Sequence, residues 1–251
     1  MKYIVIIGAS SGMGRGVAET YARMGWRVGV AARRSEPLKQ LALEWPEQME
    51  YSAYDAAADD SADRLAELVE RTGGMDILLF AAGCGWYNPE VDTNDDLRTI
   101  SANVTGFTRT VNAAFHYYAS RGSGGRIAAI TSVAGVRGLG VSAAYSASKR
   151  YQWNYLQALE QLARSRRLNI SFTDIRPGFV HTALLGRGPT SLPMTMDTEH
   201  AVRLIVKALS HGRNIVTIDR RWAIVSALWR LIPGTLWRRI SPFRTDSAGH
   251  M

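Results

Sequence analysis

The fold is decided by residues 4–14, which read Ile4-Val5-Ile6-Ile7-Gly8-Ala9-Ser10-Ser11-Gly12-Met13-Gly14. Four β-favouring residues run into a glycine-rich turn, and a helical pattern follows, so a buried strand, a turn and a helix are expected in that order. Glycines allow a tight turn, and the start of a helix offers free N–H groups and a positive dipole end to a phosphate. The turn could simply connect strand to helix, but its place after the first strand favours dinucleotide binding. The residues predicted to bind the dinucleotide there are Gly8, Ser10, Ser11, Gly12, Met13 and Gly14.

Short apolar runs alternate with helical patterns along most of the 251 residues. Strands are predicted at 3–7, 27–32, 49–54, 76–81, 125–131, 169–175 and 214–218, and helices at 12–24, 36–44, 60–72, 95–119, 143–166 and 197–211. Continuous apolar strands that alternate with helices indicate a parallel sheet covered on both faces. With right-handed crossovers, the pattern predicts an α/β protein: a single-domain Rossmann fold with a doubly wound, mostly parallel seven-stranded sheet and helices on both faces.

The charge of the chain is uneven. It holds 30 Lys and Arg residues against 22 Asp and Glu, a net charge of +8, but residues 220–251 alone contain six Arg and one Asp. An excess that lies mainly in one terminal segment argues against nucleic-acid binding by the whole body, and no nucleic-acid partner is expected. Cys84 is the only cysteine, which excludes an intramolecular disulfide and a multi-cysteine metal site. No metal is therefore expected, and the cysteine usage fits a reducing cytosol.

The residues at the end of the second predicted strand indicate which dinucleotide is bound. An acidic residue there would bind the ribose 2′-hydroxyl of NAD, whereas arginine accommodates the 2′-phosphate of NADP. This chain has Arg33 and Arg34, and no acid stands beside them to repel a phosphate. NADP(H) is therefore the preferred cofactor, with NAD(H) as the alternative. Both arginines could also be solvated surface residues.

A second constellation lies in the middle of the chain. Tyr145 and Lys149 are four residues apart, so on a helix they share one face, and an ammonium near a phenol lowers the pKa of the phenol. Such a tyrosine can act as an acid or base near neutral pH. Ser132 follows the strand predicted at 125–131, at the edge where parallel sheets bind ligands.

These motifs together resemble those of the classical short-chain dehydrogenase/reductase family over nearly the whole chain. Each is weak alone, but their order and spacing make the set specific. The matching motifs, in the order of the family, are Gly8-x3-Gly12-x-Gly14, Asp55, Asn103-Val104-Thr105-Gly106, Ser132, Tyr145-x3-Lys149 and Pro177-Gly178-x-Val180-x-Thr182. There are two departures: Ile7 stands where the family usually has Thr, and Phe80-Ala81-Ala82-Gly83 replaces Asn-Asn-Ala-Gly.

The resemblance implies a catalytic set of Asn103, Ser132, Tyr145 and Lys149. Tyr145 would give a proton to a carbonyl or take one from an alcohol, and Ser132 would hydrogen-bond the substrate oxygen. Lys149 would lower the pKa of Tyr145 and hold the nicotinamide ribose. Asn103 would position a water that links Lys149 to solvent.

The resemblance also implies cofactor contacts beyond the first turn. Asp55 would bind the adenine, and Val180 and Thr182 would contact the nicotinamide carboxamide. Structural alternatives remain, since Asn103 could cap a local turn, Asp55 could be a loop acid and Thr182 could cap a helix. The further cofactor-binding residues implied in this way are Arg33, Arg34, Asp55, Ala82, Gly83, Tyr145, Lys149, Pro177, Gly178, Val180 and Thr182.

The implied activity is that of an NADP-dependent oxidoreductase that interconverts a carbonyl and a secondary alcohol. Residues 1–219 would form the catalytic domain, with a substrate loop near 183–196, and 220–251 a basic, Trp-rich segment of the same domain. A homodimer or homotetramer, built through the long helices near 95–119 and 143–166, is expected. The rivals are a non-catalytic dinucleotide sensor on the same fold and a membrane-surface reductase of a lipid-like carbonyl.

The substrate pocket should be walled by loops after the fourth, fifth and sixth strands. Its expected lining is apolar and partly aromatic, which favours a small hydrophobic substrate. His181 is expected to be exposed rather than catalytic. The expected lining residues are Cys84, Trp86, Tyr87, 133–141, Leu184, Leu185, Met194 and Met196.

The C-terminal segment combines tryptophans with arginines. Residues 222–232 would form a helix that is apolar nearly all round, broken only by Ser226 and Arg230 on one face, and Pro233 stops it. Burial against its own domain or a partner subunit is the favoured interpretation, and peripheral membrane contact through 220–243 is the alternative. The first residues do not resemble a signal peptide and no stretch could span a bilayer, so a cytoplasmic location, with membrane association as the alternative, is expected.

Overall fold

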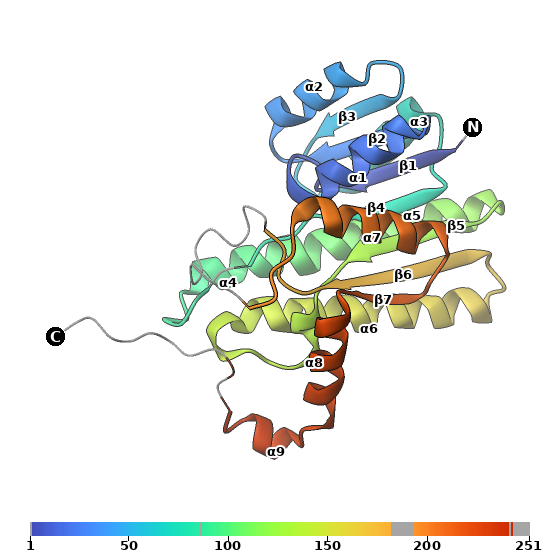
Figure 1. The fold of residues 1–251 in the computed structure, drawn as a ribbon. Coiled ribbons are helices and arrows are strands. Elements are labelled where there is room, and N and C mark those ends of the chain that lie inside the picture. The colour runs from blue at the N-terminus through green and yellow to red at the C-terminus, as the bar shows by residue number, and fades with distance from the viewer. Residues whose placement is uncertain (1, 86, 182–192, 241, 243–251) are drawn as a thin grey trace.

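A seven-stranded parallel sheet forms the centre of the protein (Figure 1). The computed structural model describes residues 2–85, 87–181, 193–240 and 242. The strand order is β3-β2-β1-β4-β5-β6-β7, and every pair of neighbours is parallel. The predicted fold is thus confirmed, with each strand within two residues of its expected bounds. The strands are β1 (Tyr3–Ile7), β2 (Arg27–Ala32), β3 (Met49–Ala53), β4 (Ile77–Phe80), β5 (Gly125–Ile130), β6 (Ile170–Pro177) and β7 (Ile215–Ile218).

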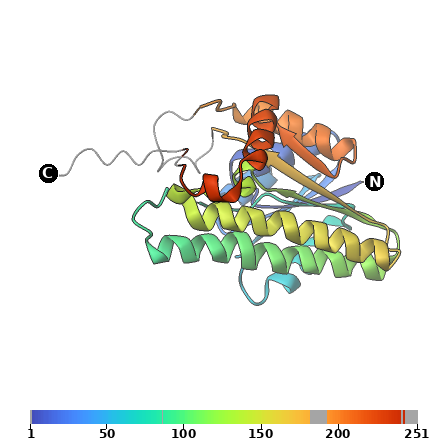
Figure 2. The same ribbon diagram turned by 90° about the horizontal axis from the view of Figure 1, so that it is seen from below.

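Helices cover both faces of the sheet because successive strand residues point to opposite sides. Ile4 and Ile6 pack with α1 (Gly12–Arg23), α2 (Ser35–Glu44) and α7 (Thr198–Ser210). Val5 and Ile7 pack on the other side with α3 (Ser61–Thr72), α5 (Phe107–Arg121) and α6 (Ala143–Ser165). Figure 2 shows α5 and α6 lying side by side along one face of the sheet, opposite α7. Both faces of each central strand are therefore apolar, as the continuous hydrophobic runs require.

The order of the strands reverses between β1 and β4. The chain winds outward from β1 to β2 and β3, then returns to pair β4 with the other side of β1. The two turns that leave β1 and β4 consequently diverge at the carboxyl edge of the sheet, the place where open α/β sheets bind ligands.

The prediction of one continuous α-helix at 95–119 is wrong in one respect, because the helix contains an irregular stretch. The structure has α4 (Thr93–Ile100), a π-helical stretch at Ser101–Gly106, and then α5. The π-helical stretch widens the helix by one residue in the turn that carries Asn103. The side chain of Asn103 leaves this turn to bond the backbone of Cys84, and such non-local contacts escape a periodicity analysis.

The C-terminal segment lies against its own domain through one side. It forms α8 (Arg220–Leu231) and the short α9 (Gly234–Trp237). Trp222 packs against Gly178, where a Cβ would lie 2.0 Å from the indole. Arg137 donates hydrogen bonds to the carbonyl oxygens of Trp229 (3.1 Å) and Arg230 (2.9 Å) at the end of α8. None of the helices in the described part of the chain is long and apolar enough to cross a membrane.

A buried ion pair on β6, the strand next to the edge strand β7, lies against α6. Both Asp174 and Arg176 on β6 are buried, with Nη2 of Arg176 2.6 Å from Oδ2 of Asp174. Thr131 donates to the other carboxylate oxygen (2.6 Å), and the guanidinium lies 3.6 Å from the ring centroid of Trp153.

Removal of the carboxylate should leave the guanidinium buried without its counter-charge. We expect Asp174→Ala to lower the free energy of unfolding by about 3–5 kcal/mol, measured by urea denaturation. Asp174→Ala/Arg176→Met should recover most of that loss, because both charges are then absent. Arg203→Ala, which removes an exposed pair with Glu199, is the matched control and should cost less than about 0.5 kcal/mol. An equal loss in both single variants would contradict the assignment.

Candidate active site

The turn after β1 has no room for a side chain at Gly8 or at Gly14. Gly8 has a φ of +97°, and a Cβ at this position would lie 2.3 Å from the backbone nitrogen of Ala82. A Cβ at Gly14 would lie 2.3 Å from the carbonyl oxygen of Gly8. The turn therefore presents bare backbone beside the first turn of α1, which begins at Gly12. This cradle fits the pyrophosphate of a dinucleotide, since free N–H groups and the positive end of α1 meet there.

The side chain of Arg34 contacts the same turn. Nη2 of Arg34 is 3.0 Å from the hydroxyl oxygens of both Ser10 and Ser11. Arg33 and Arg34 are exposed, so both guanidiniums face solvent at the end of β2. Asp55 follows β3 at the same edge, where it accepts a hydrogen bond from the backbone of Ala57 (2.9 Å). The arrangement offers positive charge and hydroxyl donors to an anion beside the turn.

Three of the predicted catalytic residues meet around one cavity. Ser132 follows β5, and Tyr145 and Lys149 lie on α6, in the first two turns after Ala143. Ser132 and Tyr145 share a side-chain hydrogen bond, and Nζ of Lys149 lies 5.6 Å from the ring centroid of Tyr145. The described residues lining this cavity are Met13, Ala81, Ala82, Gly83, Ile130, Thr131, Ser132, Tyr145, Lys149, Pro177, Gly178, Phe179 and Val180.

The pKa of Tyr145 is raised, whereas a lowered pKa was expected. Although an edge of the side chain stays accessible, protein surrounds the phenol, and this burial raises the pKa of Tyr145 above its ordinary value. The hydrogen bond with Ser132 acts in the opposite direction and does not outweigh it. Nζ of Lys149 makes its own hydrogen bonds to the carbonyl oxygen of Ile130 and to Oε1 of Gln152, each at 3.2 Å.

The pKa of Lys149 is also shifted from its ordinary value. The lysine is buried at the foot of the cavity, and this burial lowers the pKa of Lys149 to about 8. The ammonium form is thus the major one at neutral pH, and it donates hydrogen bonds to a carbonyl and an amide oxygen.

The residue missed by sequence reasoning is Gln152. It is completely buried, and its amide bridges two members of the predicted set. Nε2 donates to the carbonyl oxygen of Asn103 (2.9 Å), and Oε1 accepts from Nζ of Lys149 (3.2 Å). Its position three residues after Lys149, on the same helical face, was the available signal.

Asn103 bonds the loop that follows β4. Its Oδ1 accepts from the backbone nitrogen of Cys84 (2.9 Å), and its Nδ2 donates to the carbonyl oxygen of Cys84 (2.7 Å) and to Ser148 (3.0 Å). The loop thus has a specific support although it lacks the two asparagines usual in the family. Burial raises the pKa of the Cys84 thiol, which favours the protonated form at neutral pH.

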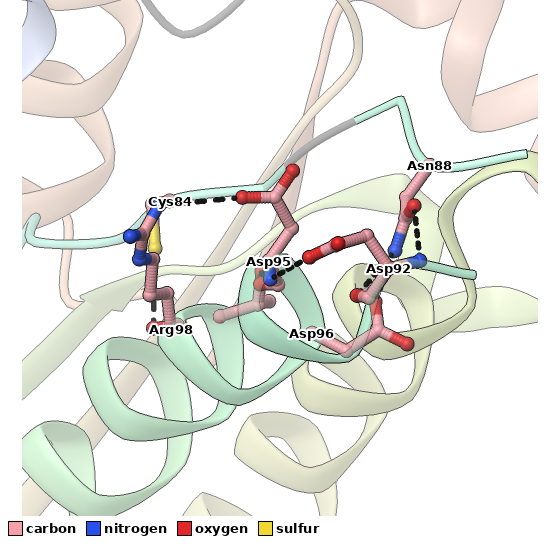
Figure 3. A network of polar contacts seen from close by, with 7 residues as sticks. Cys84, Asn88, Asp92, Asp95, Asp96 and Arg98 are labelled. Atoms are coloured by element: carbon pink, nitrogen blue, oxygen red, sulfur yellow. Dashed lines mark hydrogen bonds and ion pairs between the residues drawn. The ribbon is translucent and has the colours of Figure 1, made fainter. Parts of the chain in front are cut away.

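A polar network fixes the next part of that loop against α4 (Figure 3). Asn88 donates to the carbonyl oxygen of Asp92 and to the carboxylate of Asp96, both at 3.0 Å. Asp92 in turn caps α4 by accepting from the backbone nitrogen of Asp95 (3.0 Å). Asn88 and Asp92 therefore tie their part of the loop to the helix that leads to Asn103.

Several residues that were expected to line the substrate pocket lie elsewhere, and others lie outside the described part of the chain. Met196 packs in the core beside α7 and does not line the cavity, and the carbonyl of Met194 accepts from Trp222 (3.3 Å). His181 is exposed, as expected. The residues that lie outside the described part of the chain are Trp86, Thr182, Leu184 and Leu185, with most of the predicted substrate loop.

The chain is similar to known proteins along most of its length. A sequence model described as short chain dehydrogenase matches residues 2–190. An uncharacterised oxidoreductase of Myxococcus xanthus is 32% identical over 241 residues, which cover 93% of each chain. The 3-oxoacyl-[acyl-carrier-protein] reductase of Homo sapiens is 30% identical over 230 residues, covering 90% of this chain and 91% of the relative.

Solved structures share the fold at lower identity. A short-chain dehydrogenase/reductase from Burkholderia phymatum, in complex with NAD, superposes with a TM-score of 0.82 at 20% identity and 98% coverage of both chains. A short chain dehydrogenase from Burkholderia cenocepacia, in complex with NADP, has a TM-score of 0.81 at 19% identity, covering 97% and 100% of the two chains. With the sequence match, these findings mean that the protein belongs to the short-chain dehydrogenase family of NAD(P)-dependent oxidoreductases.

The buried lysine should make stability depend on pH. The pKa of Lys149 lies near 8 in the folded protein against 10.5 ordinarily, so the unfolded chain holds this proton more tightly. Stability should therefore rise with pH between these two values. Between about pH 7.5 and 9.5, the free energy of unfolding of the cofactor-free protein should gain about 2 kcal/mol relative to Lys149→Met. Urea denaturation at both pH values measures the gain, and parallel curves for the two proteins would contradict the shifted pKa.

Proposed function

We propose that the protein is an NADP-dependent oxidoreductase that interconverts a carbonyl and a secondary alcohol on a small hydrophobic substrate. The observation that carries the proposal is the meeting of Ser132, Tyr145 and Lys149 at one cavity beside the glycine-rich turn. Ala82, Met13 and Val180 line the same cavity, so a bound nicotinamide would lie next to the phenol. When bound, the dinucleotide supplies the hydride.

Tyr145 is the proposed general acid. A pKa raised by burial keeps its phenol protonated through neutral pH, which is the state that can donate a proton to a carbonyl oxygen. The protonated phenol is the form that carbonyl reduction requires. Ser132, hydrogen-bonded to Tyr145, would bind the same oxygen and stabilise the negative charge that develops on it.

Lys149 and Gln152 have supporting roles in this scheme. The Lys149 ammonium, near the phenol and buried, would stabilise the phenolate left after proton donation and hold a ribose hydroxyl of the cofactor. Gln152 links Lys149 to the carbonyl of Asn103, where the resemblance implies a relay water. We assign Gln152 as a positioning residue, which holds the ammonium in place without touching the reacting atoms.

Replacement of the acid tests the reaction. Tyr145→Phe keeps the ring and removes the proton, so kcat with a panel of hydrophobic ketones and NADPH should fall about 10²- to 10⁴-fold. Tyr51→Phe, on β3 and outside the cavity, is the matched control and should keep its activity. Undiminished turnover by Tyr145→Phe would refute the proposed acid and favour a dinucleotide-binding protein without this catalysis.

The preference for NADP rests on Arg34. Its contacts with Ser10 and Ser11 leave the guanidinium beside the turn, where a 2′-phosphate could form charge-assisted hydrogen bonds. Arg34→Ala should raise the Kd for NADPH about 10- to 100-fold and leave the Kd for NADH nearly unchanged, as measured by fluorescence titration. Lys39→Ala, an exposed basic residue on α2, is the control. Equal effects on both cofactors would refute recognition of the 2′-phosphate by Arg34.

We also propose a homodimer or homotetramer in the cytoplasm. The long helices α5 and α6 lie together on one face and carry partly buried aromatic rings, among them Tyr151 and Tyr155, which stack with centroids 5.3 Å apart. Aromatic side chains of this kind are enriched in subunit interfaces. Light scattering of the purified protein measures the mass and so the number of subunits.

A further inference from the structure

The helix α8 turns its apolar side outward. Ile224, Leu228 and Leu231 follow each other at intervals of four and three residues, so they lie on one face of the helix. Their exposed fractions are 63%, 57% and 78%. Ser226, which interrupts the apolar pattern, is buried instead. This is the reverse of the pattern that a helix on a water-soluble surface normally has.

The exposed apolar surface continues beyond α8. Leu236 in α9 is half exposed, and Ile240 after it is 42% exposed. We call the five side chains of Ile224, Leu228, Leu231, Leu236 and Ile240 the apolar stripe. Exposed apolar side chains that gather in one segment of a chain mark a candidate binding surface.

Arginines stand at both ends of the apolar stripe. Arg220 precedes it, and Arg238 and Arg239 lie between its last two members; all three are exposed. Between residues 220 and 240 the sequence has five Arg and neither Asp nor Glu. Asp219 pairs with Arg221 (2.6 Å), so the rest of the segment keeps its positive charge.

The outward orientation of the apolar stripe is fixed by contacts on the inner side. Trp222 meets Phe179 edge to face, with centroids 5.2 Å apart, and is buried. Trp237 is buried as well, and its indole nitrogen donates to the carbonyl oxygen of Gly138 (2.9 Å). Arg137 holds the carboxyl end of α8. Because three anchors hold the segment, it cannot rotate to hide the stripe without losing them.

We propose that the apolar stripe docks the protein on an anionic lipid bilayer. Its apolar side chains would enter the boundary between headgroups and acyl chains, and Arg220, Arg238 and Arg239 would contact lipid phosphates. The positive charge around the stripe favours an anionic bilayer over a second copy of the chain as its binding partner. Two copies packed stripe to stripe would bring arginines together without acids, whereas an anionic surface neutralises them.

Vesicle co-sedimentation of the full chain tests the proposal. The wild-type protein should bind vesicles of phosphatidylcholine mixed with phosphatidylglycerol, and bind at least about tenfold more weakly to phosphatidylcholine alone or at about 1 M salt. Leu228→Ser/Leu231→Ser should lose at least about tenfold in affinity, because it removes two exposed members of the stripe, including the most exposed one. Arg238→Gln/Arg239→Gln should lose most of the preference for the anionic lipid.

The matched control is Met24→Ser/Leu43→Ser, which changes two exposed apolar residues elsewhere on the surface. It should bind vesicles as the wild type does. Failure of the wild-type protein to bind mixed vesicles, or equal binding by Leu228→Ser/Leu231→Ser, overturns the proposal. If the wild type binds no vesicles and this variant lowers the mass measured by light scattering, a second copy covers the stripe instead. None of these readouts requires turnover, so they stand apart from the proposed reaction.

Discussion

Everything at the carboxyl edge of the sheet depends on how closely the turns after β1 and β4 approach each other. A methyl group on Gly8 would lie 2.3 Å from the backbone of Ala82, so the two turns can meet only if one of them has no side chain. This approach sets the distance between the phosphate cradle and the cavity that holds Tyr145 and Lys149. A dinucleotide is a long molecule with two ends, and the rigid separation of its two subsites is what a Rossmann sheet supplies.

The fold could be predicted from the sequence because its signals are local. Each central strand is apolar on both faces, and each connecting helix shows a periodic apolar side, so element type and order follow from the pattern. The position of Ser132, Tyr145 and the glycine turn could also be predicted, since parallel strands end at one edge. The same reasoning placed Arg34 at that edge, where the structure brings it to Ser10 and Ser11.

What escaped prediction depends on contacts between distant segments. Gln152 looks like an ordinary helix residue until the carbonyl of Asn103, far along the chain, is found beside it. The raised pKa of Tyr145 follows from burial, which no spacing of residues reveals. The side of α8 that faces the protein is determined by Gly178 and Phe179, so an almost uniformly apolar sequence could not indicate which residues remain outside.

The π-helical stretch at residues 101–106 connects α4 and α5 without a break in the helix. It rotates the side chains of α5 about the helix axis relative to those of α4. One extra residue turns everything after it by about 100° relative to an uninterrupted α-helix. The apolar residues of α5 can thus face the sheet while α4, whose Leu97 and Ile100 stay exposed, lies beside α6. A deletion of one residue in this stretch would restore regular winding at the expense of that alignment, and Asn103 would no longer point at the loop it supports. The π-helical stretch therefore allows two consecutive helices to contribute both to the core, through α5, and to the site, through Asn103.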